Sequence, residues 1–300
     1  NMNPEEIEVR REFNQLLANC IRCDKKGDKP LIRKAFKLAF DAHKGMRRKS
    51  GELYIFHPLA VARIVNQEIG LGTKSMICSL LHDVVEDTEY TLEDIDRMFG
   101  PKIASIIDGL TKISGVFDAN TSQQAENFKK IMLTLSDDVR VILIKIADRL
   151  HNMRTLDSLS QRKQMKISSE TIYLFAPLAH RLGLYSIKTE LEDLSLKYLH
   201  PKAYTDLETK LRKSEASQQA FLEEFKIPIA KRLKAEGLEF EITARQKSIY
   251  SIWQKMQNKN VPFEKIYDLI AIRIVFDPGD IPEKTQCWNI YSLTTDIYKP

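Results

Sequence analysis

An apolar run is followed directly by the acidic sequence HDVVEDT, which begins at His82. Its apolar residues recur at the spacing of one helix face, which predicts a single amphipathic helix over 73–87. On that helix His82 and Glu86 share a face, because residues four apart are neighbours. With Asp83 and Asp87 beside them, the carboxylates repel one another unless a cation lies between them, and imidazole with carboxylate suits a divalent metal. The stretch indicates part of a metal site or, as the alternative, a solvated acidic helix surface.

The composition restricts the class of protein. The chain has 300 residues, of which 43% are apolar and 29% charged, which is typical of a soluble globular protein with one large or two ordinary domains. No apolar run approaches the roughly 20 residues that span a bilayer, and the polar, acidic N-terminus is no signal peptide. The net charge of +5 is spread among nearly as many acids, which fits a small anionic ligand better than nucleic acid. We therefore expect a cytoplasmic protein without membrane contact.

Four cysteines allow zinc or redox chemistry to be considered. Cys20 and Cys23 form a CxxC motif in what looks like a helix, with no second pair nearby. A structural zinc site needs four ligands. We therefore expect four reduced thiols, with a zinc or redox role for the CxxC motif as the alternative.

Helical periodicity dominates the first two thirds of the chain. Apolar spacing, caps and breakers predict helices over 4–20, 31–43, 57–67, 73–87, 92–99, 102–110 and 125–135, and again over 160–199 with breaks at Pro177 and Gly183. The β-branched run from Val139 could be a buried strand, but its helical period continues to Thr155 and favours one long buried helix. Residues 114–126 are polar and mixed, which indicates a mobile loop.

The pattern changes near Gly237. Residues 202–235 predict a charged helical connector. Beyond it we expect a strand over 238–244, a helix over 248–257 and an apolar, buried strand over 267–276. Two strands and one helix are too little for a domain. The predicted fold class is therefore mainly α, with an all-helical domain, a helical linker and a partial α/β piece.

Two further residues extend the metal-type pattern. His57 lies at a helix start before Pro58, and Asp148 lies on the long buried helix, where an unpaired carboxylate is costly. Together with the His82–Asp83 pair they provide two imidazoles and two carboxylates, which suit Mn²⁺, Fe²⁺ or Mg²⁺ better than thiolate zinc. Such a metal generates hydroxide near neutral pH. Taken singly, His57 could instead cap a helix and Asp148 could form a buried salt bridge.

Other polar residues lie within reach of this pattern. Glu86 and Asp87 are one turn beyond the His–Asp pair, where a carboxylate can orient a water or move a proton. Asn152 and Thr155 follow Asp148 on the same helix face, where an amide and a hydroxyl suit a bound ligand. A basic loop between two glycines offers further contacts to a base or a phosphate, from Arg48, Lys49 and Ser50. The alternative for this loop is an ordinary solvated surface.

Four motifs occur in an order that is similar to a known family. They are RKSG from Arg48, FHP from Phe56, HDVVEDT from His82 and ADRLHNMRT from Ala147. They resemble the hydrolase domain of the long RelA/SpoT homologue (Rel) family, the bacterial stringent-response enzymes that make and destroy (p)ppGpp. The resemblance covers nearly the whole chain. It implies an HD-type, all-helical hydrolase domain over 4–200, a helical linker over 201–236 and the start of a nucleotidyltransferase-like synthetase domain over 237–300.

The resemblance also implies a role for each residue of the site. One Mn²⁺ would be held by His57, His82, Asp83 and Asp148. The attacking water would be positioned or activated by Glu86 and Asp87. The guanine nucleotide would be bound by Arg48, Lys49, Ser50, Asn152 and Thr155. Each position carries the residue that the family has, so the resemblance predicts a competent hydrolase.

The C-terminal part resembles the start of the family's synthetase domain. A strand, two basic residues and a helix N-terminus make a phosphate cradle. The resemblance implies ATP contacts from Arg245, Lys247, Ser251 and Lys255, and Mg²⁺ binding by Asp268. The family's acceptor-binding loop, a catalytic Glu and the modules that meet ribosome and tRNA are expected only after Pro300. The resemblance therefore predicts hydrolysis without synthesis in these 300 residues.

The predicted activity is Mn²⁺-dependent removal of the 3′-pyrophosphate of (p)ppGpp, giving GDP or GTP and pyrophosphate. The full-length parent is expected also to make (p)ppGpp from ATP and GDP or GTP. Two alternatives stay open, namely an HD phosphohydrolase of another nucleotide and a non-catalytic nucleotide-sensing module. The basic loop argues against the first, and the intact metal-type positions argue against the second. We also expect the 114–126 loop, next to Lys112, to move with substrate, and an oligomer is possible.

Overall fold

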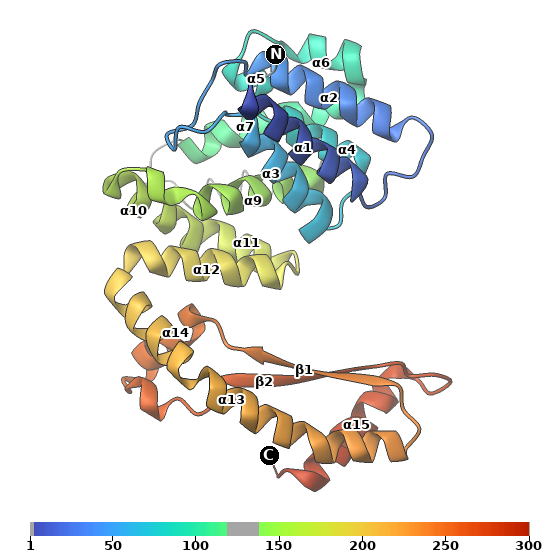
Figure 1. Ribbon diagram of the computed structural model, residues 1–300, viewed down its shortest axis with the longest axis vertical. Coiled ribbons are helices and arrows are strands. Elements are labelled where there is room, and N and C mark those ends of the chain that lie inside the picture. Colours follow the sequence, from blue (N-terminus) through green and yellow to red (C-terminus); the bar gives the residue numbers. More distant parts are fainter. Residues whose placement is uncertain (1–2, 119–137, 300) are drawn as a thin grey trace. The chain divides into compact units, whose positions relative to one another are not determined.

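The computed structural model describes residues 3–118 and 138–299. The chain divides into two compact units, Asn1–Ser195 and Leu196–Pro300. Helices make up most of each unit, and the second unit adds one small sheet (Figure 1). In the described ranges, no helix has both the length and the apolar character needed to cross a membrane. The mainly helical fold class predicted from periodicity is confirmed.

The first half of unit one is a run of short helices. They are α1 (Pro4–Ala18), α2 (Asp28–Ala42), α3 (Phe56–Arg63) continued by the π-helix η1 (Ile64–Glu68), α4 (Thr73–Leu81), α5 (Val84–Asp87), α6 (Leu92–Phe99) and α7 (Pro101–Asp118). The local sequence explains several starts. Asn3 accepts a hydrogen bond from the Glu5 N–H, and Thr91 with Asp94 forms a capping box at the start of α6.

The second half of unit one contains the long helix and the elements that follow it. They are α9 (Val139–Arg154), the 3-10 turn η3 (Leu156–Ser158), α10 (Gln161–Glu170), the π-helix η4 (Thr171–Phe175), α11 (Ala176–Arg181) and α12 (Tyr185–Leu199). The prediction of one long helix from Val139 is confirmed. The predicted break at Pro177 is wrong, because Pro177 lies in the first turn of α11, where its missing N–H is tolerated. Gly183, at φ +75°, follows α11 as predicted.

The core of unit one holds the site-bearing helices in place. Helices α3, α4 and α9 contact one another. Each of them contributes fully buried side chains to the core, such as Val61, Leu80 and Ile146. Each such side chain contributes about 2 kcal/mol relative to exposure. The ends of these three helices are therefore fixed relative to one another.

The prediction of one helix over 73–87 is wrong at its centre. Helix α4 ends at Leu81, His82 and Asp83 form a turn, and α5 is a separate element of 4 residues. Asp83 has φ −102° and ψ −5°, the sparsely populated bridge region in which site residues are often found. The apolar spacing continues through the turn because Val84 is still buried, so periodicity could not reveal the break. His82 and Glu86 consequently do not share one helix face.

The loop predicted over 114–126 is also partly wrong. Residues 114–118 are the last part of α7, because the helical spacing of Leu110 and Ile113 carries the helix on. Residues 119–126 and the helix predicted over 125–135 lie outside the described residues.

Unit two is built on one long helix and two strands. Its elements are α13 (Pro201–Ala235), β1 (Phe240–Gln246), α14 (Ile249–Lys259), the 3-10 turn η5 (Phe263–Lys265), β2 (Ile270–Phe276) and α15 (Glu283–Ile297). Strands β1 and β2 pair antiparallel, with Phe240 opposite Phe276. The prediction of a fully buried second strand is wrong, because exposure alternates along β2 and only one face packs on the helices. That face adjoins a core of Ile229, Leu233 and Ile290 from α13 and α15.

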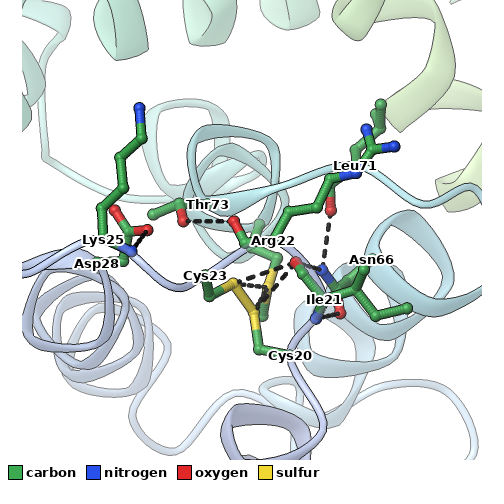
Figure 2. The surroundings of a disulfide bond; sticks show 10 residues. Cys20, Ile21, Arg22, Cys23, Lys25, Asp28, Asn66, Leu71 and Thr73 are labelled. Atoms are coloured by element: carbon green, nitrogen blue, oxygen red, sulfur yellow. Dashed lines mark hydrogen bonds between the residues drawn. A yellow bond between two sulfur atoms is a disulfide. The ribbon is translucent and has the colours of Figure 1, made fainter.

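The expectation of four free thiols is wrong for the CxxC motif. Cys20 and Cys23 are joined by a disulfide in the turn after α1 (Figure 2). The motif is not helical, because α1 ends at Ala18 and Arg22 has a left-handed backbone at φ +57°. Cys78, which is buried, and Cys287, which is exposed, are free.

Candidate functional site

Four polar side chains converge where α3, the α4–α5 turn and α9 meet. His57 Nε2 lies 3.1 Å from Asp148 Oδ1 and 3.8 Å from Asp83 Oδ2. His82 Nε2 lies 2.9 Å from Asp83 Oδ2 and 3.9 Å from Asp148 Oδ1. Ligand atoms of His57, His82 and Asp83 all lie within 4.8 Å of one another, a spacing that can hold a metal ion. The structure thus brings together all four residues that were predicted as metal ligands.

The imidazole of His82 is oriented for coordination. The His82 ring is fully buried, and its Nδ1–H donates to the Ser79 carbonyl oxygen over 2.7 Å. Nε2 therefore carries the free lone pair. Among the described residues Nε2 has no hydrogen-bond partner, since the nearby Asp83 oxygen does not meet the geometry of one. A buried nitrogen left without a partner is costly, and a metal ion would satisfy it.

A chain of side chains fixes the tautomer of His57. His57 Nδ1 and His151 Nδ1 lie 2.7 Å apart, and an Arg48 Nη1 lies 3.0 Å from the same His151 nitrogen. Guanidinium can only donate, so His151 Nδ1 is an acceptor and His57 Nδ1 must donate its proton to it. His57 Nε2, which faces the carboxylates, then carries a free lone pair. Both buried histidines thus direct Nε2, and not Nδ1, to the same point, where a metal ion could replace any proton on that nitrogen.

Electrostatics keep both carboxylates ionised. Burial alone would raise the pKa of Asp148, but Lys145, 3.6 Å away, and the two imidazoles hold it well below its usual range. Burial opposes ionisation of Asp83 in the same way, and His82 outweighs it, so the pKa of Asp83 is lowered. For His82, burial lowers the pKa, but the adjacent carboxylates overcome this and raise it to about 9. Two carboxylates and two imidazoles at this spacing fit a divalent cation, which would take the place of a proton.

Two supporting residues were not predicted from the sequence. Tyr54 Oη donates to Asp83 Oδ2 over 2.5 Å, and its ring stacks on His43 at a centroid distance of 4.7 Å. Burial, with the Asp83 charge, raises the pKa of Tyr54, so it remains a donor. Lys145 lies three residues before Asp148 on the same helix. In the sequence, Tyr54 lies three residues before His57, and Lys145 lies three residues before Asp148. This spacing could have pointed to a supporting role, but it is common in any helix.

The predicted nucleotide-binding residues lie beside this cluster. Arg48 Nη2 donates to Asn152 Oδ1 over 2.9 Å, and Asn152 Nδ2 donates to Asp148 Oδ1 over 2.8 Å. The predicted sharing of one helix face by Asp148 and Asn152 is therefore confirmed. The Thr155 hydroxyl donates to the His151 carbonyl at the end of α9.

A cavity of about 570 Å³ opens next to these residues. It is lined by Arg47, Arg48, Lys49, Tyr54, Arg149, Asn152, Thr155, Ser158, Leu159, Lys163, Lys166, Ile167 and Glu170. Ser50, in the turn that Gly51 closes, does not line it. Lys163 and Lys166 of α10 were not predicted, because they lie in an ordinary charged helix far from any motif. The wall is rich in cations, which suits a ligand carrying several phosphates.

Glu86 and Asp87 lie apart from the four clustered residues. Both are exposed on α5, and neither belongs to the group whose ligand atoms meet. Asp87 lies close enough to Tyr54 to affect its pKa, and the Asp87 N–H donates to the Asp83 carbonyl. They therefore border the cluster from the solvent side.

A second group of predicted residues meets in unit two. Lys247 and Lys255 both donate to Asp268 Oδ2, and together they lower the pKa of Asp268. Ser251 lies at the start of α14, where its N–H donates to the Ser248 hydroxyl oxygen. Arg245 lies on β1, opposite Ala271.

Known proteins resemble both parts of the chain. Residues 35–185 match the family model for an HD domain, and residues 244–300 match the region found in RelA and SpoT proteins. A probable guanosine-3′,5′-bis(diphosphate) 3′-pyrophosphohydrolase of Synechocystis is 45% identical, over 90% of this chain and 35% of that protein. A GTP pyrophosphokinase of Myxococcus xanthus is 41% identical, over 91% and 36%. The bifunctional (p)ppGpp synthase/hydrolase SpoT of Escherichia coli K12 is 38% identical, over 90% and 38%.

The helical fold and the His–Asp cluster define an HD-domain protein, and the match over half of the chain agrees. Residues 244–300 match the region found in RelA and SpoT proteins, and the relatives are named as (p)ppGpp hydrolases or synthases. The chain therefore belongs to the RelA/SpoT homologue family. The chain spans 35–38% of the length of these curated relatives.

Proposed function

We propose that this chain hydrolyses (p)ppGpp at its 3′-pyrophosphate, giving GDP or GTP and pyrophosphate. The observation that carries the proposal is the His57–His82–Asp83–Asp148 cluster beside a cation-lined cavity. The names of the relatives from Synechocystis and Escherichia coli support the choice of substrate. The reaction would take place in the cytoplasm, as a step of the stringent response.

The proposed metal is Mn²⁺, held by His57, His82, Asp83 and Asp148. Two imidazole nitrogens and two carboxylate oxygens form a borderline-to-hard donor set, which suits Mn²⁺ better than a thiolate-preferring ion. A divalent cation supplies Lewis acidity that makes water a nucleophile near neutral pH. Tyr54 would hold Asp83 by its hydrogen bond, and His151 would hold His57 in the coordinating tautomer.

Glu86 and Asp87 are proposed to act on the attacking water. They border the cluster from the solvent side without joining it, a position from which a carboxylate can orient a water and accept its proton. The departing pyrophosphate would be stabilised by the cations of the cavity wall. The residues that bind the metal would thus be different from the residues that orient and deprotonate the water.

The cavity residues are proposed to bind the nucleotide. Arg48 and Asn152 form a hydrogen-bonded pair at the border of cluster and cavity, where the guanidinium could stack on a base or grip a phosphate. Lys49 and Thr155 line the same wall. Ser50 is proposed to contribute from the adjacent turn.

Residues 4–200 would then form the hydrolase domain, 201–236 a helical linker and 237–300 the start of a synthetase domain. Within a complete synthetase domain, Arg245, Lys247, Ser251 and Lys255 would contact ATP, and Asp268 would bind Mg²⁺, for (p)ppGpp synthesis from ATP and GDP or GTP. The Asp268–Lys247–Lys255 group supports this, because ATP phosphates and Mg²⁺ would replace these mutual ion pairs. Ribosome or tRNA contacts are proposed only for regions outside these residues.

The test is pyrophosphate release from ppGpp by the purified chain, with Mn²⁺ added or chelated. A panel of ppGpp, pppGpp, a cyclic dinucleotide and dGTP separates the proposal from an HD phosphohydrolase of another nucleotide. Metal-dependent release of pyrophosphate from ppGpp and pppGpp, with little turnover of the cyclic dinucleotide and dGTP, is the expected result. Nucleotide binding without any turnover would instead make the chain a sensing module.

A further inference from the structure

The disulfide of unit one joins two cysteines with different exposure. Cys23 is 3% exposed, whereas Cys20 is only partly buried, in the turn that follows α1. An accessible sulfur next to a buried one is the arrangement that lets an external thiol attack one defined atom. Figure 2 shows this turn against the segment that carries Asn66, Leu71 and Thr73.

The turn is clamped by a buried amide. The fully buried Asn66 of η1 accepts from the Ile21 N–H over 3.0 Å and donates to the carbonyl oxygens of Ile21 and Leu71, both over 2.8 Å. Two of these three hydrogen bonds hold Ile21, which lies between the cysteines, and the third ties Asn66 to Leu71. The Asn66 amide thus uses both of its N–H groups and one of its two oxygen lone pairs. By fixing the backbone between the cysteines, the clamp favours a short distance between the two sulfurs, which raises the effective concentration of one thiol for the other.

A third sulfur atom, that of Met76, lies beside the disulfide. Met76 Sδ lies 3.0 Å from Cys20 Sγ and 3.8 Å from Cys23 Sγ. Met76 belongs to α4 and is fully buried. The pair is therefore seated on the domain core, in a soft, polarisable setting.

The bond adds little as a structural staple. It closes a loop with a sequence separation of 3, and short loops restrict the unfolded chain least. Helices α1 and α2 already have buried faces of their own, including Leu16 and Ile32. A disulfide that is partly exposed and contributes little to stability is suited to exchange with an external thiol.

We propose that Cys20 and Cys23 form a reversible thiol–disulfide site that exchanges with a small-molecule thiol of the glutathione type. In reduction, the external thiolate attacks Cys20 Sγ, the S–S bond breaks, and Cys23 leaves as a thiolate that takes up a proton. A second external thiol then attacks the external sulfur of the mixed disulfide and releases Cys20 as a thiol. Overall, one protein disulfide and two thiols give one protein dithiol and one small-molecule disulfide.

The direct test equilibrates the whole 300-residue chain in glutathione buffers of graded redox ratio, then quenches, alkylates and maps the peptides. Cys20 and Cys23 should titrate together as a two-electron couple, with a midpoint inside the buffered range. Cys78 should remain reduced throughout, because it is buried and burial raises its pKa to about 12. Alkylation of both cysteines in the most oxidising buffer, or of neither in the most reducing one, would overturn the proposal.

Two single-cysteine variants test which sulfur is attacked. Cys23→Ser should capture glutathione at Cys20, whereas Cys20→Ser should leave the buried Cys23 largely unmodified. Peptide mapping separates this from reaction at the exposed Cys287. Equal capture at both positions would contradict the assigned direction of attack.

The clamp has its own test. Asn66→Ala should lower the equilibrium constant for disulfide formation about tenfold, which corresponds to a midpoint about 30 mV more oxidising. Asn258→Ala, an exposed amide in unit two, is the matched control and should leave the midpoint unchanged. An unchanged midpoint in folded Asn66→Ala protein would show that the clamp does not prepare the pair.

Discussion

The Nδ1 atoms of His57 and His151 lie 2.7 Å apart, and Arg48 donates to the same His151 nitrogen over 3.0 Å. Because Arg48 can only donate, His151 is the acceptor for both neighbours. The proton on His57 Nδ1 then leaves Nε2 free for coordination. His151, which lies outside the cluster of four polar residues, therefore determines which ring nitrogen of His57 is unprotonated.

Removing His151 should weaken the metal site without removing a ligand. His151→Ala frees the tautomer of His57, and we expect Mn²⁺ affinity to fall about 10- to 100-fold, as loss of such supporting hydrogen bonds does elsewhere. Isothermal titration of the metal-free protein with Mn²⁺ measures this. His180→Ala, at an exposed ring in the same unit, is the control and should bind as the parent does. Unchanged affinity in His151→Ala would refute the role assigned to this hydrogen bond.

The neutral state of His151 also predicts a pH dependence of stability. Burial, with the neighbouring His57 and Arg48, lowers the pKa of His151 to about 3. Below its unfolded value of about 6.5 the unfolded chain therefore binds a proton that the folded chain does not, and stability falls as pH falls. In EDTA, this group should remove about 2 kcal/mol between pH 6.5 and pH 5. Urea unfolding at both pH values should give a smaller loss for His151→Ala than for the parent; equal losses would contradict this cause.

Tyr54 is expected to position Asp83. Its hydroxyl donates to Asp83 Oδ2 over 2.5 Å, so Tyr54→Phe should weaken Mn²⁺ binding about tenfold while the fold stays intact. Titration calorimetry and thermal unfolding measure the two properties separately. Tyr291→Phe, at an exposed ring in unit two, is the matched control. A parent-like affinity in Tyr54→Phe would show that Asp83 needs no such partner.

The α10 lysines of the cavity wall give a prediction about substrate. Lys163 has no ion-pair partner among the described residues, so it is available to a phosphate. Lys163→Ala should raise KM for ppGpp about three- to tenfold, with kcat nearly unchanged, and the effect should shrink in high salt. Lys259→Ala, at the exposed end of α14, should change neither constant. A fall in kcat alone would assign Lys163 to the chemical step.

Asp138 caps the N-terminus of α9, so we expect it to contribute to the stability of the fold. Asp138 caps the helix by accepting from the Arg140 N–H, and it pairs with Lys102 over 2.8 Å. Asp138→Ala should cost about 1–2 kcal/mol of unfolding free energy, the usual effect of losing such a cap. Asp138→Asn keeps an acceptor and should lose less. Equal stability of all three proteins would mean that α9, and with it Asp148, is held by its packing alone.

The helical order was accessible from the sequence because amphipathic spacing is a local property. The long helix from Val139, the capping box at Thr91 and the convergence of four ligand-type residues all follow from spacing and residue chemistry. The turn at His82–Asp83 was not accessible, because the apolar spacing of Val84 continues across it. His151 lies in a recognised motif, yet its role depends on contacts with residues 94 and 103 positions away.

Longer-range features show the same limit. The second strand is as apolar as a buried one, and only its antiparallel pairing with β1 reveals that one face is exposed. The Cys20–Cys23 bond follows from the early end of α1 and from the clamp by Asn66, which is 45 residues away from Ile21. Tertiary contacts of this kind leave no periodic trace in the chain.

Asp83 is proposed to hold the metal, whereas Glu86 is proposed to act on water. The most direct measurement is metal content and pyrophosphate release in Asp83→Asn and Glu86→Gln protein, after the same Mn²⁺ loading and desalting. Asp83→Asn should lose both the metal and turnover, and Glu86→Gln should keep about one Mn²⁺ per chain while turnover falls by about 10²-fold or more. Glu86→Gln protein that is empty of metal, or Asp83→Asn protein that is fully loaded and active, would contradict the account.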